Sequence, residues 1–262
     1  MKVRALAIEG AYEFTPDVFP DDRGLFLNPY VAAAVAEAVG YPLALAQTNH
    51  SVSRRGVLRG VHFALVPPGQ AKYVYCPAGA GLDVLVDLRV GSPTFGRHDV
   101  VTLDDVDFRA VYVPEGLGHS FLALADGTVL NYLCSTGYNP GREKGINPLD
   151  PDLGLPWPPD IDLVLSARDR SAPSLAEARD QGLLASHDEC QAHYAQLRAG
   201  HCSRPNRPGG PEPAGRPGTG RDRPLATGPV SGAGRGPRGP VASTGRPPGR
   251  SPRPVRTAGC RR

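Results

Sequence analysis

The sequence has three lysines, one methionine and one tryptophan among 262 residues, and it lacks a long apolar run. A membrane-spanning helix needs roughly 18 to 20 consecutive apolar residues, and no window approaches that length. The N-terminal MKVRALAIEG also lacks the apolar core of a secretory signal peptide. We therefore expect a cytoplasmic protein with no membrane partner.

Paired cysteines are also missing. The chain has an odd number of them and no CxxC spacing, so neither a disulfide framework nor a cysteine zinc cluster is predicted. The five are Cys76, Cys134, Cys190, Cys202 and Cys260.

Residues 201–262 have a composition unlike the rest. They contain thirteen Arg, two acidic residues and dense Pro and Gly, but no Lys, Phe, Trp, Tyr, Ile or Met. Such a segment cannot bury enough apolar surface to offset the entropy lost on ordering. We therefore expect a folded domain over residues 1–200 and a disordered Pro/Gly/Arg-rich tail over residues 201–262. A natural extension and a reading-frame artefact both fit this composition.

The charge of the chain is divided unevenly. Because the whole chain carries +3 and the tail +11, residues 1–200 carry −8. An acidic body argues against nucleic acid as a partner of the folded domain, although the basic tail alone can adsorb to polyanions.

The stretch from Ala44 to Cys134 predicts a protein built mainly of β-strands. Short runs rich in Val, Leu and Tyr are broken by Gly, Pro and Asp at regular intervals, as in antiparallel sheets. The predicted strands cover residues 57–63, 71–76, 82–90, 98–103, 110–114, 119–124 and 128–134. This spacing favours an all-β jelly roll, a sandwich or barrel of two sheets around an internal pocket.

Helical signals are few and peripheral. Residues 29–40 end at a Gly, and residues 173–184 begin with Ser174 as the predicted N-cap. Residues 147–170 form a Pro-rich crossing segment, which we expect to pack over a surface or to line a site.

His62 lies in the predicted strand GVLRGVHF. Period-two alternation puts Leu58, Gly60 and His62 on one face of this strand, and Arg59 and Val61 on the other. The preceding residues QTNHSVSRR add further polar side chains to a segment otherwise suited to a buried strand. Buried polar groups need partners or a ligand, so the pattern predicts a site.

A metal site is the competing interpretation of His62. Many jelly rolls bind iron, manganese or zinc through an HxH pair, a Glu and a later His. Here Phe63 and Ala64 follow His62, so the strand supplies no second histidine. His119 can still meet His62 in space, but no carboxylate is placed to complete a ligand set. We expect no metal.

Six segments together carry a resemblance to a known family. They are QTNHSVSRRGVLRGVHF, QAKYVYC, LDVLVDLRVGSPTFG, VPEGLGHSFLAL, YLCSTGY and LSARDRSAPSL. In order and spacing, this string resembles the dTDP-4-dehydrorhamnose 3,5-epimerase family over roughly residues 3 to 185. The resemblance implies a cupin-like jelly roll that needs no cofactor, forms a homodimer and binds a dTDP-4-keto-6-deoxyhexose inside each barrel.

The resemblance also implies roles in proton transfer. His62 matches the family's base and Asp169 the carboxylate paired with it, while Tyr132 matches the acid on the opposite side of the sugar ring. Lys72 matches a lysine near the ketone, where a cation stabilises the enolate oxygen. Asp83 is predicted to support His62 or Lys72, with a structural ion pair as the alternative. Without the resemblance, Asp169 can equally be a turn cap and Tyr132 a barrel-filling side chain.

Further positions match family residues that contact the substrate. Arg23 and Arg59 bring guanidinium groups suited to phosphate oxygens, with surface solvation as the alternative for Arg23. Gln47 and Asn49 match residues near the thymidine and its phosphates. His119 matches a position in the pocket.

The match loosens at two places. The chain reads RGLFLN where family members usually read RGFFLE, so Asn28 replaces a carboxylate. It reads YLCSTGY where they read YKCTDYY, which places Leu133 and Gly137 at a lysine and an acidic residue and retains Tyr138. Because inversion of a second carbon requires the sugar ring to shift, the surroundings of Tyr138 are predicted to decide between C3, C5 or both.

Three alternatives stay open beside an epimerase of deoxysugar biosynthesis. A sugar-nucleotide ketoisomerase on the same barrel moves the carbonyl instead of inverting a centre. A non-catalytic sugar-nucleotide binding protein exchanges no protons. A partner-binding or nucleic-acid-binding protein depends on the tail.

Overall fold

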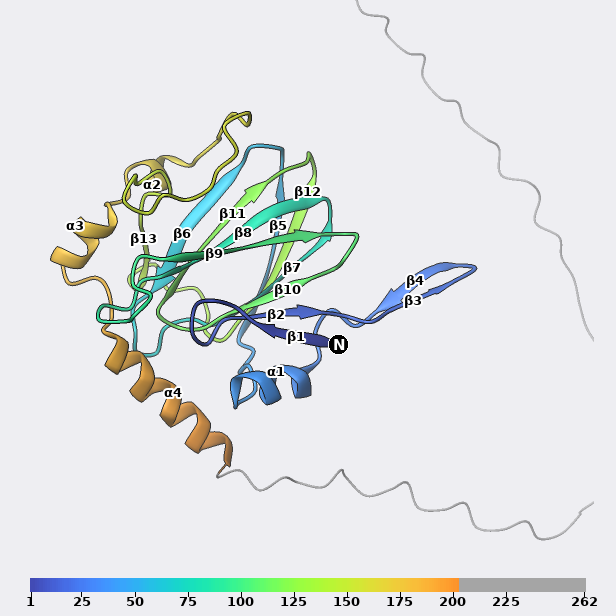
Figure 1. Cartoon of the computed structure of the whole chain (residues 1–262), viewed down its shortest axis with the longest axis horizontal. Helices are drawn as coiled ribbons and strands as arrows, with labels where there is room; N and C mark the ends of the chain where they lie inside the picture. The colour runs from blue at the N-terminus through green and yellow to red at the C-terminus, as the bar shows by residue number, and fades with distance from the viewer. Residues whose placement is uncertain (203–262) are drawn as a thin grey trace, which may run out of the picture. The chain divides into compact units, whose positions relative to one another are not determined.

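Strands with alternating apolar residues pair to form two antiparallel sheets that face each other (Figure 1). The structure is a computed structural model and describes residues 1–202, so the predicted tail lies outside the described residues except for its first two positions. Strands distant in sequence are neighbours within each sheet, as in a jelly roll. The all-β, cupin-like jelly-roll prediction is confirmed.

One sheet has six strands, and we call it the six-stranded sheet. In spatial order it contains β1 (Lys2–Ala5), β2 (Tyr12–Thr15), β10 (Ala110–Val113), β7 (Lys72–Ala78), β12 (Thr128–Cys134) and β5 (Gln47–Ser53). The five-stranded sheet contains β13 (Glu143–Gly145), β6 (Leu58–Ala64), β11 (Leu117–Ala123), β8 (Ala80–Asp87) and β9 (His98–Asp104).

All seven predicted strands are present, with each end within three residues of its predicted position. The predicted strands did not include seven-residue β5 or the shorter strands β1, β2 and β13. Four-residue β1 is exposed along its whole length, so no buried alternation marks it. Its place is fixed by pairing with β2, which local sequence does not reveal.

The main core lies between the two sheets. Inward-facing apolar residues of both sheets fill part of this space, and Phe121 and Leu130 stand at its border with the cavity described below. The central members include Val74, Leu85, Leu103, Val111, Val113 and Leu117. This packing sets the separation of the sheets, and with it the width of the cavity.

Helices and the crossing segment cover the outer faces. Helix α1 (Ala32–Val39) packs Val35 against the outer side of the six-stranded sheet and ends at Gly40, whose φ of 90° is left-handed and whose N–H bonds to Ala36. Helix α3 (Leu175–Asp180) begins with a capping box between Ser174 and Glu177. Both predicted helix ends are therefore confirmed.

The crossing segment 147–170 lies along the five-stranded sheet. Leu153, Trp157 and Ile161 pack against clusters that include residues of β6 and β11. A parallel bridge joins Val57 to Val164. The segment then ends in the short helix α2 (Ala167–Arg170), beside β6.

Helix α4 (His187–Cys202) was not predicted, because its polar sequence gives only a weak apolar stripe. Its start did carry a signal: Ser186 and Glu189 bond reciprocally, as in a capping box. Cys190 and Tyr194 are the buried residues that attach it to the barrel. The predicted domain end at residue 200 falls inside this helix. Among the described residues, no helix is long and apolar enough to cross a membrane.

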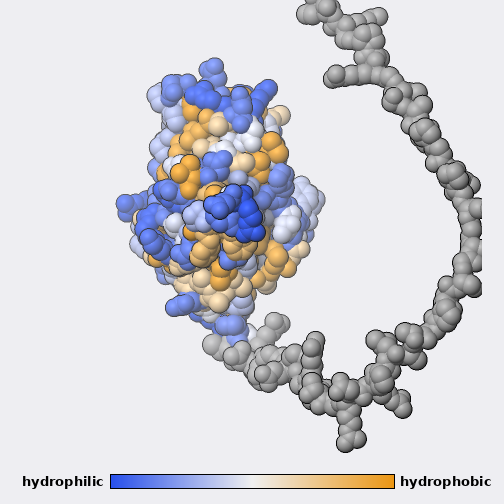
Figure 2. Space-filling view, turned by 90° about the vertical axis from the view of Figure 1, so that its right-hand side faces the viewer, coloured by the Kyte–Doolittle hydropathy of each residue, from blue (hydrophilic) through white to orange (hydrophobic). Residues whose placement is uncertain are grey.

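A two-stranded hairpin of β3 (Val18–Asp21) and β4 (Gly24–Leu27) projects away from both sheets (Figure 1). Its side chains include Phe19, Leu25 and Phe26, which are 55%, 54% and 62% exposed. Figure 2 views the molecule from the side toward which the hairpin points, and hydrophobic and hydrophilic side chains mix on that face. We call this feature the β3–β4 arm.

Candidate active site

A cavity of about 240 Å³ lies between the two sheets. The five-stranded sheet and α2 form one wall, and β7 and β12 of the six-stranded sheet form the other. Its lining combines charged, aromatic and apolar side chains: Arg59, His62, Lys72, His119, Phe121, Leu130, Tyr132, Ser166, Arg168 and Asp169. We call it the central cavity.

His62 and Asp169 form a pair on one wall of the central cavity. The Asp169 Oδ1 atom lies 2.7 Å from His62 Nε2, although the residues are 107 positions apart. Helix α2 makes this contact possible, because the Ser166 side chain accepts from the Asp169 N–H and caps the helix. Burial opposes ionisation of Asp169, but His62 and Ser166 outweigh it and hold the carboxyl pKa below its usual value. The carboxylate therefore fixes Nε2 as the protonated nitrogen and leaves Nδ1 free to accept a proton.

Arg59 shares the central cavity with His62, so the expectation that they occupy opposite faces of the strand was wrong. Strand β6 pairs with β11 at His62–His119 and then at Arg59–Phe121, with a register shift between the two pairs. Gly60 sits at this irregularity with φ of 115°. A β-bulge breaks period-two alternation, and here it turns both side chains toward the cavity.

Tyr132 approaches from the opposite sheet. It lies on β12, while His62 lies on β6, and both line the same cavity. Burial is the main cause that raises the pKa of the Tyr132 phenol; nearby Cys134 and Glu143 add to the rise, and Arg59 opposes it. The phenol therefore keeps its proton at neutral pH and can donate it.

Lys72 begins β7 and is buried, with 9% of its surface exposed. Among the described residues its ammonium group has no hydrogen-bond or ion-pair partner. Burial lowers its pKa, while nearby Cys134, Glu143 and Asp83 oppose the fall. A buried cation that lacks a direct partner is free to interact with a negatively charged ligand.

Asp83 pairs with His119 rather than with His62 or Lys72. The distance from its Oδ2 atom to His119 Nε2 is 2.7 Å, and Asp83 is completely buried. Its other oxygen, Oδ1, has no partner among the described residues. The central cavity is thus lined by histidines of two adjacent strands, β6 and β11, and each histidine is paired with a carboxylate.

Four predicted binding residues do not line the central cavity. Gln47 and Asn49 share the inner face of β5 next to Tyr132, and the Gln47 amide donates to Asn49 Oδ1 at 2.6 Å. Tyr138 is 59% exposed in the loop after β12. Arg23 sits on the β3–β4 arm with 89% of its side chain exposed, paired only with Asp21.

Arg168 was missed by the sequence reasoning and does line the central cavity. It precedes Asp169 in SARDR, so the match at Asp169 already pointed to its neighbourhood. Its guanidinium donates to the backbone oxygen of Glu143 at 3.3 Å, which leaves other N–H groups available. Together with Arg59 it makes the rim of the cavity basic.

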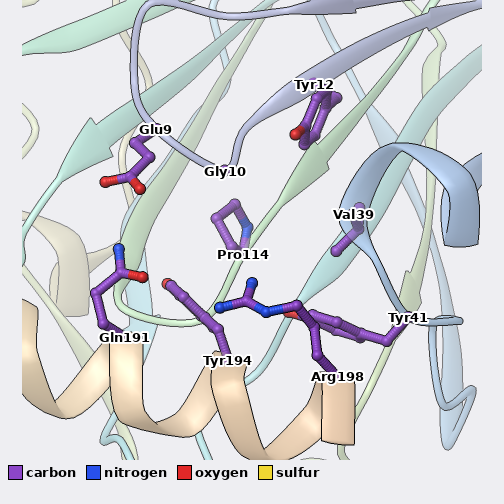
Figure 3. A pocket seen from close by; sticks show the side chains of 9 residues that line it. All are labelled: Glu9, Gly10, Tyr12, Val39, Tyr41, Pro114, Gln191, Tyr194 and Arg198. Carbon is purple, nitrogen blue, oxygen red and sulfur yellow. The ribbon is translucent and has the colours of Figure 1, made fainter. Parts of the chain in front are cut away.

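A second, smaller cavity of about 140 Å³ lies against α4 (Figure 3). It shares no residue with the central cavity. Tyr194 and Arg198 of α4 point into it beside Tyr41, and Tyr194 donates to the backbone oxygen of Glu115. The Tyr194 hydrogen bond attaches α4 to the barrel at this cavity.

No group of three or more metal-ligating side chains occurs within residues 1–202. His62 and His119 are paired across neighbouring strands, yet each already has its own carboxylate. The nitrogen facing each carboxylate is Nε2.

The fold and the site together define a jelly-roll protein whose interior opposes an imidazole–carboxylate pair to a phenol, the equipment of an acid–base enzyme. Comparison with known proteins makes this specific. The chain belongs to the dTDP-4-dehydrorhamnose 3,5-epimerase family, whose sequence pattern matches residues 5–177.

Two curated relatives and one solved structure illustrate the match. The dTDP-4-dehydrorhamnose 3-epimerase of Streptomyces niveus is 56% identical over 192 residues, covering 73% of this chain and 92% of the relative. The dTDP-4-dehydrorhamnose 3,5-epimerase of Streptomyces griseus is 54% identical, covering 74% and 97%. The crystal structure of a 3'-monoepimerase from Streptomyces bikiniensis with dTDP-quinovose is 48% identical with a TM-score of 0.73, covering 74% and 98%.

Proposed function

We propose that the protein inverts C3 of a dTDP-4-keto-6-deoxyhexose, in deoxysugar biosynthesis. The observation that carries this proposal is the His62–Asp169 pair facing Tyr132 across one cavity. The choice of C3 is supported by the relatives, because the names of the 3-epimerases and of the 3,5-epimerases share that carbon.

In the first step His62 removes the C3 proton. The ketone at C4 acidifies its neighbouring C–H bonds, so the electron pair of the broken bond moves onto the ketone oxygen as an enolate. Asp169 stabilises the imidazolium that forms. Lys72, which lines the same cavity, is proposed to stabilise the developing oxyanion, and the step moves a proton without a change of oxidation state.

In the second step Tyr132 returns a proton to C3 from the opposite face. The enolate electron pair forms the new C–H bond, and the ketone is restored. Inversion requires the two groups on opposite faces of the ring, and the two sheets supply one each. The phenolate left on Tyr132 and the imidazolium of His62 then reset by exchange with water.

We propose that Arg59 and Arg168 hold the diphosphate at the rim of the central cavity. Guanidinium groups match phosphate oxygens through paired donors. Gln47 and Asn49, next to Tyr132 on the inner face of β5, are proposed to contact the nucleotide. His119 lines the cavity, with Asp83 orienting its ring.

We also propose that the protein is a homodimer. The β3–β4 arm exposes Phe19, Leu25 and Phe26, and a second copy that covers them removes this apolar surface from water. In the single chain Arg23 is remote from the central cavity lining. An arm seated on a second copy is the route by which Arg23 can act on a substrate.

Deuterium exchange tests the proposed reaction. The protein is incubated with dTDP-4-keto-6-deoxyglucose in deuterated water, and the positions of label and the product configuration are read by NMR. We expect label and inversion at C3, and label at C5 shows that both centres react. A product with its carbonyl moved supports a ketoisomerase instead. Binding of dTDP with no label at either carbon supports a non-catalytic binder and contradicts the proposal.

A further inference from the structure

Glu143, on β13 at the edge of the five-stranded sheet, lies close to the central cavity without lining it, and the reaction described above does not use it. Strand β13 pairs with β6 so that Gly145 lies opposite His62 and Glu143 opposite Ala64. Directly opposed residues of an antiparallel pair share a face, and residues two apart on one strand also do. Because His62 faces the space between the sheets, Glu143 faces it too.

The surroundings of Glu143 place it against the start of β7 and the end of β12. It lines a small cavity of about 110 Å³ together with Gln70 and Thr136, which flank these two strands. At this end of the sheet Lys72 and Cys134 are direct cross-strand partners. Glu143 therefore lies close to the buried lysine.

The Glu143 carboxylate is half-buried and makes no hydrogen bond or ion pair within residues 1–202, where only its backbone groups are engaged. The Lys72 ammonium likewise has no direct partner there. Asp83, the other carboxylate near Lys72, already bonds to His119. Glu143 is thus the nearby carboxylate that no side chain has neutralised.

We propose that Glu143 is a positioning residue that keeps the Lys72 ammonium charged and the Tyr132 phenol protonated inside the central cavity. This inference rests on the proposed function, in which both groups act in those forms. It assigns to β13 a part in the reaction rather than only an edge position in the five-stranded sheet.

The charges around both groups agree with this role. Burial lowers the pKa of Lys72, and Glu143 opposes the fall; burial raises the pKa of Tyr132, and Glu143 adds to the rise. The other ionisable groups around them come from β6, β8, β11, β12 and α2: Arg59, His62, Asp83, His119, Cys134, Arg168 and Asp169. Of these, Arg59 acts against Glu143 at Tyr132.

The first test measures Lys72 directly and needs no turnover. The chain has only three lysines, Lys2, Lys72 and Lys144, so the full-length protein labelled with ¹⁵N at lysine Nζ gives few signals. Glu143→Gln is expected to lower the pH at which Lys72 loses its proton. Glu37→Gln, which removes the same charge from an exposed position on α1, should leave it unchanged. An unchanged Lys72 titration in Glu143→Gln overturns the proposal.

The second test follows epimerisation against pH. The ratio of kcat at pH 9 to kcat at pH 7 is expected to fall roughly three- to tenfold in Glu143→Gln and to recover in Glu143→Asp. A uniform loss at all pH values indicates a purely structural role and also overturns the proposal. Because the lysine titration is independent of catalysis, a protein that does not epimerise its substrate still gives a decisive answer about Glu143.

Discussion

At the residue scale, one contact decides which nitrogen of His62 acts as the base. We expect Asp169→Asn to lower kcat by roughly a hundredfold to ten-thousandfold, because an amide no longer stabilises the imidazolium or fixes its tautomer. Steady-state kinetics on the 4-keto sugar nucleotide measure the loss. Asp152→Asn, at an exposed position in the crossing segment, is the matched control and should keep full activity.

The same contact has a pH-dependent effect on stability. The folded pKa of Asp169 lies below its unfolded value of about 3.9, so the pair contributes stability above that pH and loses it as the pH falls through the folded pKa. The free energy of unfolding of Asp169→Asn should therefore fall short of wild type at pH 7, and the gap should narrow below about pH 4. Urea denaturation at pH 7 and pH 3 measures both gaps. A difference in the free energy of unfolding that is the same at both pH values contradicts a stabilising role for the ionised Asp169 carboxylate.

Substitutions of Tyr132 and of His62 are expected to remove different steps of the reaction. Without its base, His62→Asn should show no solvent exchange at C3. Tyr132→Phe keeps the base but lacks the acid, so it should exchange the C3 proton while forming product at least roughly a hundredfold more slowly. NMR in deuterated water separates exchange from inversion. Equal loss of both in Tyr132→Phe would count against its role as the acid.

A structure of the Streptomyces bikiniensis 3'-monoepimerase with dTDP carries two substitutions, histidine to asparagine and tyrosine to phenylalanine. Those two positions are separated by the same number of residues as His62 and Tyr132. The shared spacing supports the choice of these two residues for substitution here. The motif string could single out His62 and Tyr132 because each lies in a predicted strand. Arg168 lies outside the predicted strands and carries no pattern of its own.

At the element scale, seven of the strands could be predicted from local alternation, but the β6 bulge could not. Alternation in GVLRGVHF placed Arg59 away from His62, and only the pairing with β11 reveals the register shift. A glycine within a strand was the available signal, because such a residue often marks a bulge or a close backbone approach. Gly60 marks both.

Replacement of Gly60 should disrupt this wall of the site. Its φ of 115° disfavours any side chain, and a Cβ there would lie 2.5 Å from the His119 backbone oxygen and 2.7 Å from Ser120 Cα. We expect Gly60→Ala to destabilise the fold by about 2 kcal/mol or more and to lower kcat. Denaturant unfolding measures the first effect. Gly127→Ala, at positive φ but in open space, is the control for backbone conformation alone.

The β3–β4 arm is the element that separates the predicted site from the observed one. Arg23 was predicted to bind substrate, yet the arm carries it away from the central cavity of its own chain. A sequence pattern can match a residue to a family position, but it cannot say where the fold places that residue. The arm was also absent from the predicted strands, because its residues are almost all exposed and no buried alternation marks them.

Polar substitutions on the arm test the proposed homodimer. We expect Phe19→Ser with Phe26→Ser to shift the protein from dimer toward monomer, because the apolar surface that a second copy covers is lost. Analytical ultracentrifugation over a range of concentrations measures this. Val106→Ser, which alters a residue 76% exposed elsewhere, should leave the oligomeric state unchanged. A monomeric wild-type protein would contradict the proposal outright.

At the scale of the whole molecule, the family pattern matches residues 5–177 and stops before the basic tail. The matches to the Streptomyces niveus and Streptomyces griseus relatives cover 92% and 97% of those proteins, but only 73% and 74% of this chain. The sequence placed the end of the folded domain at residue 200 from composition alone. Helix α4 continues to Cys202, because a composition boundary does not register the last turn of a polar helix.

We propose that residues 1–202 hold the complete epimerase, and truncation after Cys202 tests this. The body carries −8 and the tail +11, so the tail can attract the anionic sugar nucleotide over a long range. Once salt screens this attraction, removal of the tail should change kcat/KM by no more than about twofold in either direction. Retention on a heparin column should be lost, since the tail supplies the positive charge. Kinetics at low salt and at about 0.15 M salt separate long-range attraction of the substrate by the tail from a direct part of the tail in the reaction. A truncated protein that loses most of its activity at both salt concentrations would show that the tail takes part in the reaction itself, because electrostatic attraction alone is weakened by added salt.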